Sequence, residues 1–280
     1  DYVRAWRSWQ QTMLHGVDCD VFVATWRKRG GKELVPVHAD RVLPLACARA
    51  YQAQVADLGE EQVRIRYPSL HAAASSSLEV TNAELHETYG PADLEIHDEG
   101  DHQFASNDEK MFFLMDRAFE LAQRKGRIYD FYLRIRPDKE IRAGSLAAII
   151  QALSPTASRE PFILTGDMPG PWLMGPHGLH IADQMALGNF AGMHAFCRPW
   201  RLRGLAAKKV AGFEFGLHAH RSLAYTLLGG AVRVGPLPIT VGGLLSPDRL
   251  EPSRLAALIA ADAAGRMDRH DDLLLRSLHS

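Results

Sequence analysis

Short apolar runs alternate with segments of helical spacing along most of the chain, and this alternation limits the folds that it can adopt. Four runs are rich in β-branched and aromatic residues, which is typical of buried strands: residues 20–26, 128–135, 161–165 and 231–234. Strands that alternate with helices favour an α/β domain. We therefore expect a three-layer α/β/α fold with a mostly parallel central sheet.

The remaining segments give the expected domain organisation. Helical spacing of the apolar residues predicts helices at residues 1–14, 45–57, 107–125, 146–153, 182–197 and 213–228, the fifth of them as a helix or a turn followed by a helix. Gly126 is the predicted C-cap of the third. Residues 63–67 alternate like a strand, whereas residues 68–106 show little pattern and predict a long, mobile loop. One domain is therefore expected over residues 1–250, with a helical tail at 251–280.

Composition excludes several classes of protein. The 280 residues hold 32 Lys and Arg against 33 Asp and Glu, a formal net charge of −1 that gives no reason to expect nucleic-acid binding. Cys19, Cys47 and Cys197 form no CxxC motif and are odd in number, which favours a reducing compartment and hence the cytoplasm. No apolar run approaches the roughly 18 to 20 residues that span a bilayer.

The strand at 128–135 runs into a cluster of charged residues. Arg134 and Arg136 carry guanidiniums that match phosphate oxygens bidentately, and Asp138 suits a divalent metal ion or a ribose. Pro137 ends the strand because it has no N–H to donate. Ligands of open α/β sheets bind outside the carboxyl ends of the strands, so this cluster is a candidate ligand site. An internal Arg–Asp salt bridge is an equally good interpretation.

Two further positions carry groups that could transfer a proton. Asp183 follows a Gly/Pro-rich segment and opens a stretch of helical spacing, where a carboxylate is an N-cap or, with water excluded, a general base. Glu214 and His218 stand four residues apart on one helix face, as an ordinary pair or as part of a site. The absence of HExxH, GxSxG, P-loop and GxGxxG motifs disfavours zincins, α/β-hydrolases, P-loop kinases and Rossmann dinucleotide enzymes.

Taken in order, these pieces resemble a family of bacterial glycosyltransferase-like proteins with a GT-A-type fold. The similar segments are residues 20–26 (DVFVATW), 110–113 (KMFF), 129–138 (YDFYLRIRPD) and 183–188 (DQMALG), with Glu214 further on. The R-x-R-P-D motif and the D-Q motif are moderately specific as a pair, and neither is so alone.

This resemblance implies transfer of a sugar from a nucleotide-sugar donor to a glycan or polysaccharide acceptor, in the synthesis of a surface glycan. It assigns donor binding to Arg134, Arg136, Asp138 and Gln184. It implies that Asp138 lies near the usual DxD aspartate and could hold Mn²⁺ or Mg²⁺. An inverting reaction also needs a base, for which Asp183 is the first candidate and His218 and Glu214 follow.

A protein of a different class carries the same features. In this alternative the chain is a catalytically silent GT-A-like module that binds a glycan or a partner glycosyltransferase. A single Asp138 in place of Asp-x-Asp favours it, as does the start at Asp1, before which the family's first strand would lie. The tail is expected to pack on the core or to dock on a partner domain, with peripheral membrane contact as a further option.

Overall fold

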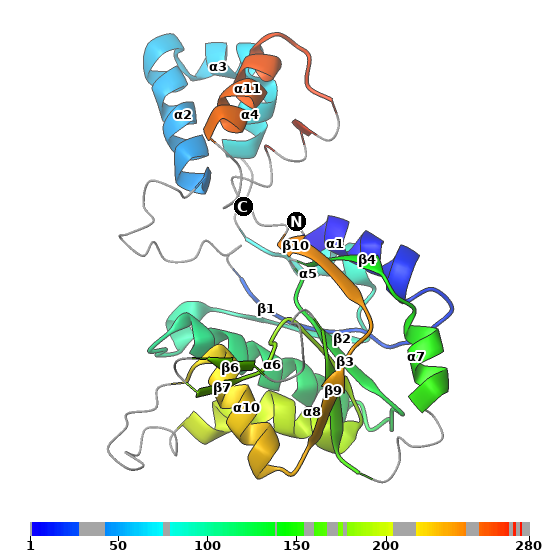
Figure 1. Cartoon of the computed structure of the whole chain (residues 1–280). Coiled ribbons are helices and arrows are strands. Elements are labelled where there is room, and N and C mark those ends of the chain that lie inside the picture. The colour runs from blue at the N-terminus through cyan, green and yellow to red at the C-terminus, as the bar shows by residue number, and fades with distance from the viewer. Residues whose placement is uncertain are drawn as a thin grey trace. The chain divides into compact units, whose positions relative to one another are not determined.

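The structure, a computed structural model, describes residues 2–27, 43–74, 79–137, 139–153, 160–166, 173–175, 178–203, 217–244, 252–268, 271–272 and 275. The chain divides into two compact units (Figure 1). Unit 1 holds Asp1–Thr25 and Asn82–Leu245, and unit 2 holds Trp26–Thr81 and Ser246–Ser280. This division differs from the predicted domain over 1–250 with a tail at 251–280, because the tail shares a core with the segment that follows the first strand.

A four-stranded sheet lies at the centre of unit 1. Its strands in spatial order are β3 (Tyr132–Ile135), β8 (Met185–Gly188), β5 (Phe162–Thr165) and β9 (Arg233–Pro236). β8 is antiparallel to both β3 and β5, whereas β5 and β9 are parallel. The mixed α/β class is therefore confirmed. The prediction of a mostly parallel central sheet is wrong for the described strands, because two of these three pairings are antiparallel.

Shorter strands surround this sheet. Three pairs are described: β1 (Phe22–Trp26) with β2 (Asp93–His97), β4 (Lys139–Ala143) with β10 (Thr240–Leu244), and β6 (Leu173–Gly175) with β7 (Gly178–His180). The last two pairs are antiparallel. The strand predicted at 20–26 is thus confirmed as β1, while β2 lies inside the predicted mobile loop.

Helices cover one face of the central sheet through a shared apolar core. They are α6 (Asn107–Arg124), α8 (Phe190–Cys197) and α10 (Ala219–Gly229) (Figure 1). α6 buries a stripe at helical spacing, with Phe112, Met115 and Phe119 packed against Ile163 of β5. Its N-terminus is capped by Ser106, whose Oγ accepts from the N–H of Glu109, and the Glu109 carboxylate accepts from the N–H of Ala105, the residue before the cap. Gly126 has a φ of +67°, as expected of a C-cap glycine.

A second core lies on alternate residues of the same strands. Met185 and Leu187 of β8 pack with residues of α1 (Tyr2–Ser8), the following π-helical turn (Trp9–Met13) and α7 (Leu146–Leu153). The indole N–H of Trp9 donates to the carbonyl oxygen of Lys139 over 2.7 Å. Both faces of β8 are therefore buried, which explains its unbroken apolar sequence.

Three predictions of local structure are wrong. Residues 63–67 lie largely in a helix, α3 (Glu60–Arg66), because acidic residues stand at its start, basic residues near its end, and Val63 is buried. The segment 68–106 holds α4 (Pro68–Ala74), α5 (Asn82–Tyr89), β2 and a 3₁₀ turn (Glu99–Asp101) rather than a long loop. Residues 185–188, predicted as helix or turn, form β8. A short apolar segment that is buried on both faces shows no alternation, so its sequence pattern does not distinguish a strand from a helix.

Unit 2 is helical in its described part. α2 (Leu43–Leu58), α3, α4 and α11 (Pro252–Ala263) gather together (Figure 1), with Leu70, Leu255 and Leu258 in their core. The buried carboxylate of Asp262 on α11 accepts hydrogen bonds from the N–H groups of Ser69 and Leu70 at 3.1 and 2.8 Å. The predicted packing of the tail on a core is thus observed within this unit. None of the described helices is long and apolar enough to cross a membrane.

Candidate functional site

One edge of the central sheet collects the two sequence motifs. Since β8 runs antiparallel to β3, the start of β8 meets the end of β3. The N–H of Arg136, directly after β3, donates to the carbonyl oxygen of Gln184, directly before β8, over 3.0 Å. β5 and β9 are parallel and also end at this edge. We call it the carboxyl rim, the position where open α/β sheets bind ligands.

An ion pair joins the two motifs at the carboxyl rim. Arg136 Nη1 lies 3.7 Å from Asp183 Oδ2; the Asp183 side chain is 6% exposed and that of Arg136 is 30% exposed. An internal Arg–Asp salt bridge, the alternative interpretation of the charged cluster after β3, is therefore present. Among the described residues its carboxylate is that of Asp183. Asp183 precedes a strand, so its interpretation as a helix N-cap is wrong. Asp138 lies outside the described residues, and its predicted role stays a prediction.

His220 joins this pair from the first turn of α10. Its Nδ1 lies 2.9 Å from the carbonyl oxygen of Ile181 and 3.9 Å from Asp183 Oδ1. Because a carbonyl can only accept, Nδ1 carries the hydrogen in this contact, and in neutral imidazole Nε2 is left with the lone pair. His220 is thus oriented as a proton acceptor beside a buried carboxylate. Sequence reasoning missed it, and the His218/His220 spacing was its only signal.

His218 lies nearby but makes different contacts. Its ring is stacked on that of His180 at 5.7 Å between centroids, and its ring centroid is 6.0 Å from that of His220. Its backbone N–H donates to Ser222 Oγ at the start of α10. Glu214, its predicted partner, lies outside the described residues, and α10 begins only at Ala219.

The predicted site for Mg²⁺ or Mn²⁺ depends on Asp138, which lies outside the described residues, so the metal stays a prediction. Mg²⁺ and Mn²⁺ prefer several oxygen ligands. Asp183 offers a carboxylate, but Arg136 pairs with it. Among the described residues there is no group of three or more His, Cys, Asp or Glu that could hold a metal ion. We therefore derive no step through a metal.

Arg134 also belongs to this edge, on the core side. It pairs with Ala186 across β3 and β8, on the face that the helices cover. Complete burial of the Cys197 thiol on α8 raises its pKa to about 12, and the positive charge of Arg134 opposes that rise. The raised pKa keeps Cys197 in its thiol form at neutral pH.

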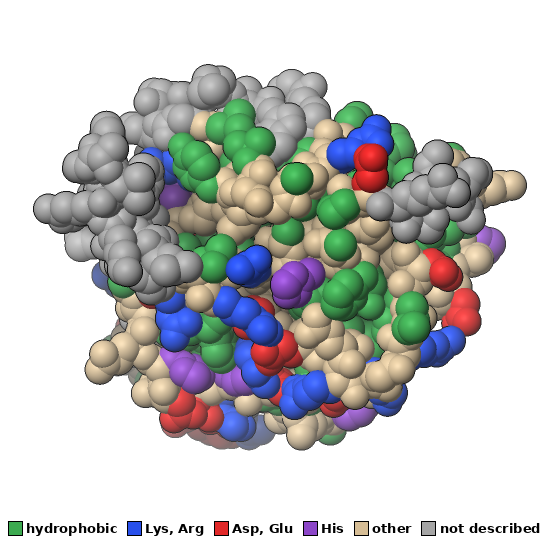
Figure 2. Space-filling model, turned by 90° about the horizontal axis from the view of Figure 1, so that it is seen from below, with side chains coloured by type: hydrophobic (Ala, Val, Ile, Leu, Met, Phe, Trp, Pro, Cys, Tyr) green, Lys and Arg blue, Asp and Glu red, His purple; other side chains and the backbone are tan. Residues whose placement is uncertain are grey.

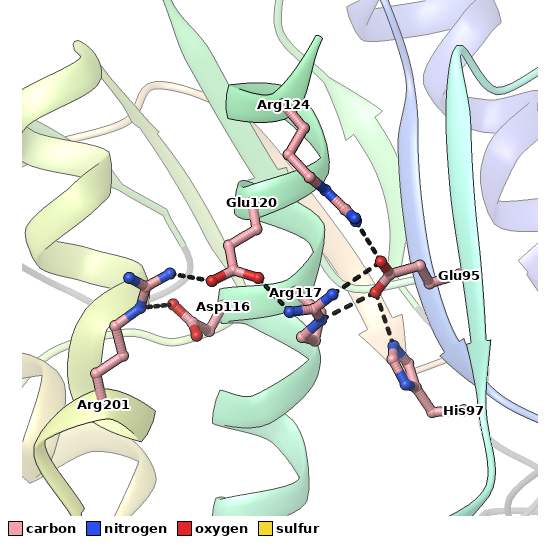
Figure 3. A network of polar contacts seen from close by, with 7 residues as sticks. All are labelled: Glu95, His97, Asp116, Arg117, Glu120, Arg124 and Arg201. Atoms are coloured by element: carbon pink, nitrogen blue, oxygen red, sulfur yellow. Dashed lines mark hydrogen bonds and ion pairs between the residues drawn. The ribbon is translucent and has the colours of Figure 1, made fainter.

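A second polar cluster lies between β2, α6 and the 3₁₀ turn at Arg198–Leu202 (Figure 3). Arg117 donates to both carboxylate oxygens of Glu95 at 2.8 and 2.9 Å, and Arg124 also donates to Glu95. Arg201 donates to Asp116 at 2.7 Å and to Glu120. These residues bind one another across three elements, so we interpret them as a structural network.

The surface carries charge of both signs. Figure 2 shows Lys and Arg side chains interspersed with Asp and Glu, with histidines among them, on the face seen from below. Basic and acidic side chains therefore lie side by side on the described part of this face.

No family model, no curated protein and no solved structure matches this chain.

Proposed function

We propose that the chain is a glycosyltransferase with a GT-A-like fold, which moves a sugar from a nucleotide-sugar donor to a glycan or polysaccharide acceptor. The observation that carries this proposal is the meeting of Arg136, Asp183 and His220 at the carboxyl rim. It joins a cation for a diphosphate leaving group to a histidine that can accept a proton. Sugar transfer by inversion requires both groups.

The reaction divides between these groups as follows. The acceptor hydroxyl attacks the anomeric carbon of the donor and forms the new glycosidic bond. Its proton passes to His220 Nε2, and the carboxylate of Asp183 stabilises the imidazolium that results. The bond between the anomeric carbon and the phosphate oxygen breaks, and its electron pair leaves with the nucleoside diphosphate. Arg136, with Arg134 behind it, stabilises the charge that develops there.

His220 takes over the role of base for which Asp183 was predicted. The side chain of Asp183 is 6% exposed and faces the Arg136 guanidinium, whereas that of His220 is 37% exposed. A base must come within hydrogen-bond reach of the acceptor hydroxyl, and the more exposed group meets that condition better. Asp183 is then a positioning residue that acts through His220.

Donor binding tests the proposal. Melting temperatures with UDP-, GDP- and dTDP-activated sugars, with and without Mn²⁺, should rise for at least one donor because binding stabilises the folded state. Arg136→Ala should weaken that binding. Arg233→Ala is the matched control, since Arg233 is exposed at the opposite end of β9 and pairs with Glu160. No shift with any donor, together with binding of a glycan, would instead support the catalytically silent module.

A further inference from the structure

The carboxyl rim ends in polar side chains on one face of an otherwise apolar sheet. Arg134 of β3 and Thr165 of β5 both pair with Ala186 of β8, so these three side chains lie in one row on the same face. Gln184 stands two positions before Ala186. One row further into the sheet, this face carries Tyr132, Gly188 and Ile163, which belong to or adjoin the helix-covered core.

Thr165 carries a buried hydroxyl at this edge. The residue is 4% exposed, and its own carbonyl oxygen already accepts from the N–H of Leu237 over 2.8 Å. Within the described ranges, Thr165 Oγ1 has no hydrogen-bond partner. A buried polar group without a partner is costly, and native proteins keep one mainly where a ligand or water completes it.

Gln184 presents a second such atom. Its Oε1 is buried and also lacks a hydrogen-bond partner in the part of the chain that is described, while the residue as a whole stays partly exposed. An amide oxygen only accepts, whereas a threonine hydroxyl both donates and accepts. Sugar hydroxyls also do both, so one hydroxyl can donate to Gln184 Oε1 and accept from Thr165 Oγ1. Ala186, between the two strands on this face, is itself buried in the helix-covered core, so the two acceptor atoms lie at the edge of that core.

We propose that Thr165 and Gln184 form a hydroxyl-binding subsite at the carboxyl rim for a hydroxyl of a sugar whose charged end lies towards Arg136. This inference rests on the proposed glycosyltransferase function and extends it to Thr165, which carries no other assigned role. The partly exposed residues Arg136 and Gln184 lie at its outer end, and buried Thr165 at its inner end.

Two variants of Thr165 test the subsite. Thr165→Val keeps the shape and removes the hydroxyl, and Thr165→Ser keeps the hydroxyl. Thr165→Val should weaken binding of a nucleotide sugar about 10-fold, while binding of the matching nucleoside diphosphate stays unchanged. Its melting temperature without ligand should stay the same or rise by about 2–4 °C, because an unsatisfied hydroxyl is removed. Thr165→Ser should bind as the wild type does.

Further outcomes show whether the sugar in the subsite belongs to the donor or to the acceptor. They also distinguish failure of the subsite from failure of the glycosyltransferase proposal. Unchanged donor affinity with a raised KM for the glycan acceptor would place the acceptor sugar in the subsite. Glucose 1-phosphate serves as a probe without a nucleotide. If wild-type protein binds it in a Thr165-dependent way but binds no nucleotide sugar, the subsite stands and the glycosyltransferase proposal falls. Equal affinity of wild type and Thr165→Val for every sugar probe, or a lowered melting temperature with unchanged binding, would overturn the subsite.

Discussion

The guanidinium of Arg136 lies 3.7 Å from the carboxylate of Asp183, although each belongs to a different motif of the sequence. The antiparallel pairing of β3 with β8 creates this contact, because it places the end of one strand beside the start of the other. Asp183 also lies 3.9 Å from His220, so one buried carboxylate faces both a permanent cation and a group that can become one.

Asp183→Asn should strongly slow sugar transfer while leaving donor binding largely intact. The amide keeps the shape of the carboxylate but removes the charge that stabilises the His220 imidazolium. We expect turnover to fall by about 100-fold or more. A donor-plus-acceptor assay measures turnover, and calorimetry measures donor affinity. Asp101→Asn, at an exposed carboxylate of the same unit, is the control. Turnover of Asp183→Asn close to that of the wild type would show that the assignment is wrong.

His220→Asn separates the structural contact of His220 from its proposed chemistry. An asparagine amide can still donate to the Ile181 carbonyl, as Nδ1 does, but it offers no basic nitrogen. Turnover should fall by about 10²- to 10⁴-fold, with little change in the free energy of unfolding. Exposed His15→Asn should leave both quantities unchanged. An active His220→Asn protein of normal stability would return the role of base to another residue.

Elements with a clear period were predictable from the sequence. α6 follows from the stripe of Phe112, Met115 and Phe119 and from its capping residues, and its predicted span of 107–125 is confirmed. β8 was not predictable, because burial on both faces leaves no alternation to read. Because β8 was not predicted, its antiparallel pairings with β3 and β5 were not predicted either. The sheet was therefore expected to be mostly parallel.

The site was predictable in its parts but not in its contacts. The residue types of Arg136 and Asp183 suit the proposed chemistry and indicate both as site residues, and the structure brings them together. Their partnership depends on strand register, which no local pattern in the sequence reports. His220 depends on a carbonyl 39 positions away in the sequence. Asp138 and Glu214 lie outside the described residues, so their predicted roles stay predictions.

A side chain at Gly192 of α8 is predicted to destabilise the fold, because the helix packs directly on β5. A Cβ at this position would come within 2.0 Å of the carbonyl oxygen of Phe162, which is backbone and cannot move aside. Gly192→Ala should therefore lower the free energy of unfolding by about 1–3 kcal/mol in urea denaturation. Gly229→Ala in α10 is the matched control, since a Cβ there meets nothing within 4 Å. Equal stability of the two variants would contradict the close packing of α8 on β5.

The network around Glu95 couples stability to acid pH. Burial disfavours the ionised carboxylate, but hydrogen bonds and positive charge from Arg117 and Arg124 outweigh it and lower the pKa of Glu95 to about 2 (Figure 3). The same group titrates near 4.5 when unperturbed. Since the folded-state pKa is the lower one, the ionised form stabilises the fold above pH 4.5, and this contribution is lost as the pH falls towards 2.

Glu95→Gln should remove this part of the pH dependence. At pH 7 the variant should be less stable by about 1–2 kcal/mol, because Arg117 loses a charged acceptor. Between pH 4.5 and 2 its stability should fall less steeply than that of the wild type. Urea denaturation at a series of pH values measures both effects, with exposed Glu87→Gln as the control. Parallel pH profiles for wild type and Glu95→Gln would mean that other carboxylates govern acid unfolding.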